Sequence, residues 1–104
     1  MKKVLFKADA IESMLFQKAI KKYGAWCIIV IIEMYSLYAT GESDLSDSDL
    51  EIIGNKIGLH FTDIYKIALD TNFFVKHKTF FNTVVPTKKL SKYFQITDEV
   101  ENGK

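Results

Sequence analysis

The sequence contains no arginine, one cysteine and one proline. Its 14 basic residues are therefore all lysines. Arginine reads guanine and phosphate with two parallel hydrogen bonds, whereas lysine is a flexible point charge. The absence of arginine thus argues against a sequence-specific reader of DNA. The lone cysteine, Cys27, cannot form an internal disulfide, which is typical of proteins that work in a reducing cytosol.

Long hydrophobic runs are also missing. The longest, Ala25–Ile32, has eight residues and stops at Glu33, whereas a membrane-spanning helix needs about 20. At the N-terminus, the apolar stretch Val4–Phe6 is broken at once by Lys7 and Asp9, so no secretion signal is expected. We therefore expect the protein to stay in the cytoplasm in which it is made.

No set of residues with the spacing of a catalytic or metal site is present. His60 and His77 are the only histidines, and neither has a metal-binding spacing with Cys27 or with an acidic residue. Cys27 lies within the apolar run, where a thiol packs as a small hydrophobe. Gly54 and Gly58 lack the glycine-lysine-serine ending of a phosphate loop. We expect no enzyme activity, no metal and no cofactor.

Size and composition predict one globular domain. A chain of 104 residues has room for one core, and 48% hydrophobic with 26% charged residues is usual for a folded domain. We expect a single domain over residues 1–96 and a polar, flexible tail over 97–104.

Lysines gather in residues 2–22 and 76–92, on either side of an acidic stretch that contains no basic residue. The acidic residues are Glu42, Asp44, Asp47, Asp49 and Glu51. Two solvated basic faces and one acidic helix start are the simplest interpretation.

The first half of the chain reads as an extended start and two helices. After residues 4–7, Asp9 is the expected cap of a helix that ends at Gly24. The inner face of this helix is apolar: Leu15, Phe16, Ala19, Ile20 and Tyr23. The second helix, 25–38, is apolar nearly all round, so we expect it to be the most enclosed element, with Trp26 and Ile29 on it. Aspartate in place of Ile29 is then expected to unfold the protein.

Two shorter helices follow. Ser46 is the expected cap of the third helix, and Gly58 its end. Thr62 is the expected cap of the fourth, which should end near Asn72. The inward residues are Leu50, Ile53 and Ile57 on the third helix, and Ile64, Ile67 and Ala68 on the fourth. The pattern then changes from helical spacing to β-type runs.

Residues 73–76 and 79–85 are rich in aromatic and β-branched side chains and flank His77-Lys78. They predict a β-hairpin whose second strand ends at Pro86, followed by a short helix over 87–94. Helices, a compact two-helix unit and a hairpin in this order predict an α+β winged-helix fold, with four to five helices and a C-terminal hairpin wing. The third and fourth helices would form the helix-turn-helix.

Aromatic residues concentrate in the expected wing, where Phe73, Phe74, Phe80 and Phe81 lie close together. Strand alternation would turn about half of these rings outward. Either all of them pack on the helices, or some remain exposed as anchors for a protein partner. The candidate partner-binding residues are Tyr65, Phe80, Phe81 and Tyr93, with Lys76 and Lys78 as charges beside them.

The fourth helix favours a protein partner over DNA. Its expected outer positions are Asp63, Lys66 and Asp70. Two carboxylates would repel phosphates, and none of the three side chains reads a base edge well. No specific DNA binding is therefore expected.

Several segments together resemble a known family. They are Phe6 with Asp9, Lys-Lys-Tyr-Gly at 21–24, Ile-Ile-Glu-Met at 31–34, the acidic segment 44–50 and Lys-Lys-Leu at 88–90. In this order they resemble the N-terminal winged-helix domain of phage replisome organisers and related replication-initiation proteins of low-GC Gram-positive bacteria, over about residues 5–94. Family members usually continue into a longer C-terminal region and have a glycine-rich start to the second helix, which here reads Gly24-Ala25-Trp26-Cys27.

A narrower resemblance rests on length, the solitary domain, the lysine- and isoleucine-rich composition and the winged-helix pattern. In these the chain is similar to small staphylococcal phage proteins that inhibit the host helicase loader. That resemblance implies binding to the AAA+ ATPase domain of the loader and inhibition of host DNA replication by occupancy, without catalysis.

Two alternatives stay open. A DNA-binding module of phage replication initiation or transcription regulation would need a continuous basic surface built from the terminal lysines. A homodimer would use the aromatic wing as its self-contact.

Overall fold

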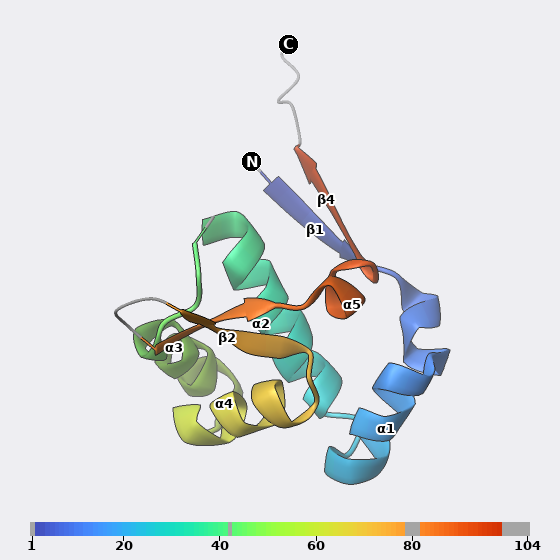
Figure 1. The fold of residues 1–104 in the computed structure, drawn as a ribbon, viewed down its shortest axis with the longest axis horizontal. Helices are drawn as coiled ribbons and strands as arrows, with labels where there is room; N and C mark the ends of the chain where they lie inside the picture. The colour runs from blue at the N-terminus through green and yellow to red at the C-terminus, as the bar shows by residue number, and fades with distance from the viewer. Residues whose placement is uncertain (1, 42, 79–81, 99–104) are drawn as a thin grey trace.

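A computed structural model describes residues 2–41, 43–78 and 82–98. The elements, in chain order, are β1 (Lys2–Phe6), the 3-10 helix η1 (Ala8–Glu12), α1 (Met14–Tyr23), α2 (Cys27–Gly41), α3 (Asp47–Ile57), α4 (Phe61–Asp70), β2 (Phe74–Lys78), β3 (Asn82–Pro86), α5 (Lys88–Ser91) and β4 (Phe94–Asp98). Figure 1 shows the helices gathered around α2, with the β2–β3 hairpin beside α3 and α4. The fold is α+β with a winged-helix arrangement, as the sequence predicts.

The ends of α3 form as expected from local sequence. The Ser46 hydroxyl accepts a hydrogen bond from the Asp49 amide, and the Asp49 carboxylate accepts one from the Ser46 amide at 2.9 Å. This capping box satisfies two amides that would otherwise have no partner at the helix start. Gly58 ends the helix with φ of 79°, a left-handed conformation that costs glycine little.

Two of the expected caps are wrong. Asp9 lies inside η1, and Ser13 caps α1 by accepting a hydrogen bond from the Phe16 amide at 3.3 Å. The fourth helix begins before Thr62, because His60 supplies the cap. Serine and aspartate are both favourable caps, so propensity alone did not choose Ser13 over Asp9. Histidine is not a favoured cap, so propensity pointed to Thr62 instead of His60.

Helix α2 runs through the core but is not enclosed on every side. Its buried residues are Cys27, Val30, Ile31, Met34, Tyr35 and Ala39. Ile29 is 55% exposed and Trp26, which precedes the helix, is 43% exposed. The prediction that both are enclosed is therefore wrong, and aspartate in place of Ile29 would face solvent instead of the core. An apolar surface all round a helix does not reveal which side neighbours cover.

The wing is joined to the helix-turn-helix by an isolated β-bridge at Leu45. β2 and β3 pair antiparallel, and Lys76 lies opposite Val84. Leu45, between α2 and α3, exchanges two backbone hydrogen bonds with Val84, at 2.9 and 3.0 Å. The Asp44 carboxylate pairs with His77 of β2 and accepts a hydrogen bond from the Thr83 hydroxyl of β3 at 3.3 Å. The base of the wing is therefore held to the loop between α2 and α3.

His77 belongs to β2, so the predicted turn at His77-Lys78 lies too early.

The hairpin rings within the described residues face inward. Phe73 and Phe74 are both buried, and the Phe73 ring lies 4.7 Å from that of Phe16. Phe73 precedes the strand, so strand alternation does not apply to it. The expectation that half of the rings turn outward is wrong for this pair, and Phe80 and Phe81 lie outside the described residues.

The C-terminal part departs most from prediction. The expected helix over 87–94 is reduced to α5, and β4 pairs antiparallel with β1. Phe6 and Phe94 lie opposite each other, with ring centroids 5.1 Å apart. Figure 1 shows this two-stranded ribbon projecting from the helices, with the start of β1 and the end of β4 at its outer end. Because β4 extends to Asp98, the predicted tail beginning at residue 97 starts too early.

Candidate partner-binding surface

A hollow of about 280 Å³ opens between the start of α4 and the wing. We call it the wing groove; it is lined by Asp47 of α3, Phe61, Thr62 and Tyr65 of α4, and Lys76 of β2. Phe61 and Tyr65 are one helical turn apart and therefore share a face of α4. The Lys76 ammonium lies 5.6 Å from the centroid of the Tyr65 ring, within range of a cation–π interaction. This contact connects the wing to α4.

Local geometry fixes the start of α4 against α3. The Leu59 amide donates to the Gly54 carbonyl at 2.9 Å, and a Cβ atom on Gly54 would lie 2.3 Å from the Leu59 carbonyl oxygen. Only glycine permits this close approach of α3 to the turn that follows it. The His60 ring accepts a hydrogen bond from the Thr62 amide at 3.3 Å and lies 4.9 Å from the Phe61 ring. The rim of the wing groove is thus set by the turn of the helix-turn-helix.

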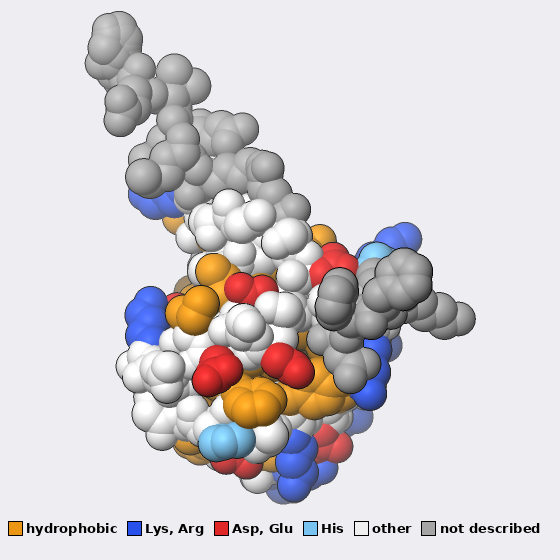
Figure 2. Space-filling model, turned by 90° about the vertical axis from the view of Figure 1, so that its left-hand side faces the viewer, with side chains coloured by type: hydrophobic (Ala, Val, Ile, Leu, Met, Phe, Trp, Pro, Cys, Tyr) orange, Lys and Arg blue, Asp and Glu red, His pale blue; other side chains and the backbone are white. Residues whose placement is uncertain are grey.

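Acidic side chains surround this side of the molecule. Asp47 and Asp49 lie in the first turn of α3, and Asp63 lies in the first turn of α4, where it is exposed. Figure 2 shows this side, with hydrophobic side chains (orange) between acidic (red) and lysine (blue) ones. Carboxylates at the helix starts complement the helix dipoles, but they would repel the phosphates of DNA. The surface combines partly exposed rings with mixed charge.

The structure brings together only some of the residues predicted for partner binding. Tyr65 and Lys76 meet in the wing groove. Tyr93 does not line it: its ring contacts Phe16 edge-on at 5.6 Å. Phe80 and Phe81, and the side chain of Lys78, lie outside the described residues.

Three residues of the groove were missed at the sequence level. Phe61 and Thr62 were missed because the fourth helix was predicted to begin at a Thr62 cap. That start leaves Phe61 outside the helix, so it would not share a helical face with Tyr65. Asp47 was interpreted only as a charge at a helix start, and nothing in its sequence position signals contact with the wing. A hydrophobic residue four positions before a partly exposed tyrosine was the one available signal.

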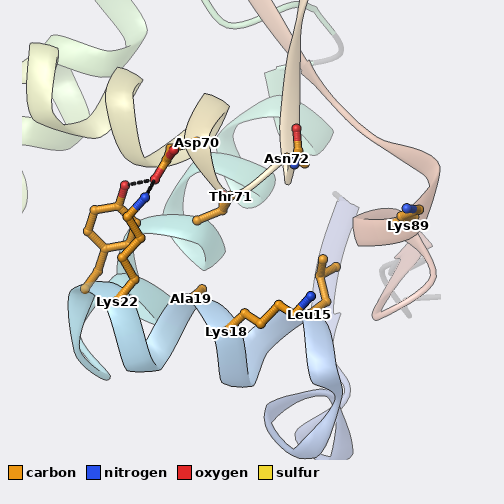
Figure 3. Close-up of a pocket in the computed structure, with 9 residues that line it drawn as sticks. Leu15, Lys18, Ala19, Lys22, Asp70, Thr71, Asn72 and Lys89 are labelled. Carbon is orange, nitrogen blue, oxygen red and sulfur yellow. Dashed lines mark hydrogen bonds and ion pairs between the residues drawn. The ribbon is translucent and has the colours of Figure 1, made fainter.

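A second hollow, of about 290 Å³, lies between α1, the end of α4 and α5. Its lysines are Lys18 and Lys22 of α1 and Lys89 of α5, so it unites lysines from both basic segments of the sequence. We call it the lysine hollow; it is drawn in Figure 3. Its other lining residues are Leu15, Ala19, Tyr23, Asp70, Thr71 and Asn72.

Asp70 is exposed, as predicted, but its carboxylate is hydrogen-bonded to two residues of α1. One oxygen accepts hydrogen bonds from the Lys22 ammonium at 2.5 Å and from the Tyr23 hydroxyl. The hydrogen bond from Lys22, followed by that from Tyr23, holds the pKa of Asp70 below its usual value. The same contacts raise the pKa of Lys22 and of Tyr23, chiefly through their hydrogen bonds to Asp70. The end of α4 is therefore joined to α1.

No cluster of three or more histidine, cysteine or acidic residues that could hold a metal ion occurs within 2–41, 43–78 and 82–98. Over the same ranges, no helix is both long enough and apolar enough to cross a membrane. Burial raises the pKa of the Cys27 thiol, which is the reverse of what a nucleophilic cysteine requires.

No protein-family model, curated protein or solved structure matches the chain in comparisons with known proteins. The resemblance to replisome organisers therefore stays a prediction from the sequence.

Proposed function

We propose that this protein is a phage-encoded, non-enzymatic inhibitor that binds the AAA+ ATPase domain of the host replicative helicase loader in the bacterial cytoplasm. Binding would inhibit host DNA replication by occupying a surface that the loader needs. The choice of partner rests on the sequence resemblance. The wing groove supports protein binding as the mode of action.

The observation that carries the proposal is the pairing of Tyr65 with Lys76 beside Phe61. The rings of Tyr65 and Phe61 are partly exposed and share one face of α4. Tyrosine is enriched at energetic hot spots because it buries a large area at small cost in side-chain entropy. Charges around such rings form the polar rim of an interface and raise the association rate more than the affinity.

The charge around the groove supports a protein partner over DNA. The exposed carboxylate of Asp63 and the two acids at the start of α3 would face the phosphates if α4 entered a major groove. A protein surface with basic groups can accommodate the same carboxylates. The DNA-binding alternative would require α4 to approach DNA despite them.

Isothermal titration of the purified ATPase domain of a staphylococcal helicase loader with this protein tests the proposal. We expect saturable binding and a fall in loader ATPase activity at stoichiometric concentration. The replicative helicase alone, used as the control titrant, should give no heat of binding. Absence of binding to the loader domain, together with an intact fold, would reject the proposed partner.

A further inference from the structure

The lysine hollow lies apart from the wing groove, on α1, the end of α4 and α5. Three lysines and one aspartate leave it with a net charge of +2. Asp70 does not neutralise the remaining lysines, because its bonded oxygen already accepts from Lys22 and Tyr23. Figure 3 shows these two bonds, while the Lys18 and Lys89 side chains carry none. Among the described residues, no acidic side chain pairs with either lysine.

The walls of the hollow combine these charges with apolar surface. Leu15, the buried Ala19 and Tyr23 of α1 line the hollow together with the lysines. Apolar walls exclude water and strengthen a charge interaction at the rim. Asn72, with φ of 61°, contributes an amide that can donate a hydrogen bond. Such a site fits an oxyanion carried on a short hydrocarbon stem.

The geometry points to the lysine hollow as a docking site for an acidic side chain, glutamate or aspartate, of a protein partner. The stem would lie on Leu15 and Ala19, and the carboxylate would lie between Lys18 and Lys89. This assignment does not depend on the identity of the partner proposed above. It adds a second contact, on a different side of the molecule from the wing groove.

A carboxylate is favoured over the phosphates of a DNA backbone because acidic groups interrupt the basic surface. Asp9 and Glu12 lie in η1, shortly before α1, and the Asp70 carboxylate borders the hollow. A DNA backbone presents phosphates at regular intervals and requires a longer uninterrupted basic track.

The test is an NMR titration of the full chain, labelled with nitrogen-15, at low salt. The probes are a capped hexaglutamate peptide, a capped hexaglutamine peptide, inorganic phosphate and a short DNA duplex. With hexaglutamate, we expect amide shifts centred on Ala19, Asn72 and Lys89, and none there with hexaglutamine. Lys18→Gln and Lys89→Gln should each weaken hexaglutamate binding about threefold, as expected for partly solvated ion pairs.

The matched control is Lys56→Gln, which removes one lysine charge on another side. Lys56 pairs with Glu33 of α2 at 2.9 Å, and its loss should leave hexaglutamate binding unchanged. Thermal melting followed by circular dichroism checks that each variant is folded. An equal loss with Lys56→Gln, or shifts outside the hollow, would overturn the assignment by showing attraction to net charge alone. Tighter binding of phosphate or duplex in the hollow would also overturn it, in favour of nucleic acid.

Discussion

The wing groove and the lysine hollow differ in how their charges are used. In the wing groove, Lys76 lies over the Tyr65 ring, and the acidic Asp47 lines the same groove. In the lysine hollow, the one acid is bonded within the protein, and Lys18 and Lys89 keep their charge for a ligand. The comparison indicates an aromatic contact with mixed charge on one side and an electrostatic contact with an acidic group on the other.

The largest expected effect is on the stability of the fold, at the turn that sets the rim of the wing groove. Gly54→Ala would place a Cβ atom 2.3 Å from the Leu59 carbonyl oxygen, so the turn between α3 and α4 must move away from α3. We expect the free energy of unfolding to fall by about 3 kcal/mol, the upper range for overpacking. Urea denaturation measures it. Gly41→Ala is the control, because its new Cβ would have only a Ser43 contact at 3.9 Å; equal stability of both variants would contradict this account.

A smaller effect should follow pH at the edge of the lysine hollow. The folded pKa of Asp70 lies below that of an unfolded aspartate, about 3.9. The pair therefore stabilises the fold above that pH, and its contribution is lost as pH falls through the folded pKa. The stability difference between the parent and Asp70→Asn should favour the parent at pH 7 and shrink toward pH 3. A difference independent of pH would show that the ion pair contributes nothing.

The smallest expected effect is on DNA. With no arginine and with Asp63 exposed on α4, duplex binding at physiological salt should be weak and independent of sequence, with a Kd of about 10⁻⁴ to 10⁻⁶ M. Fluorescence anisotropy with unrelated duplexes at several salt concentrations measures it. Nanomolar, sequence-selective binding would favour the DNA-binding hypothesis over binding to the helicase loader.

Helical pattern and capping made the central fold predictable. Ser46, Gly58 and the stripe of Ile64 and Ile67 placed α3 and α4 close to their observed positions, and the β-rich segment after them predicted the wing. These features are local, since each depends on residues within a few positions along the chain.

Long-range pairings could not be predicted in the same way. β1 and β4 are separated by almost the whole chain, and short runs of mixed polarity do not identify each other as partners. The exposure of Ile29 has the same origin, because neighbouring elements decide which side of an apolar helix is covered. Both hollows combine residues from elements distant in sequence, so spacing alone could not show that Lys18 and Lys89 line one hollow or that Tyr65 meets Lys76.

The central claim is that the wing groove binds the loader, and the most direct measurement is isothermal titration of the loader ATPase domain with Tyr65→Ala and Tyr93→Ala. Tyr65 lines the groove, whereas Tyr93 packs against Phe16 elsewhere and serves as the matched tyrosine control. We predict that Tyr65→Ala weakens binding by more than about 2 kcal/mol, the usual threshold of a hot spot, while a folded Tyr93→Ala binds like the parent. Unchanged affinity of a folded Tyr65→Ala variant would contradict the claim.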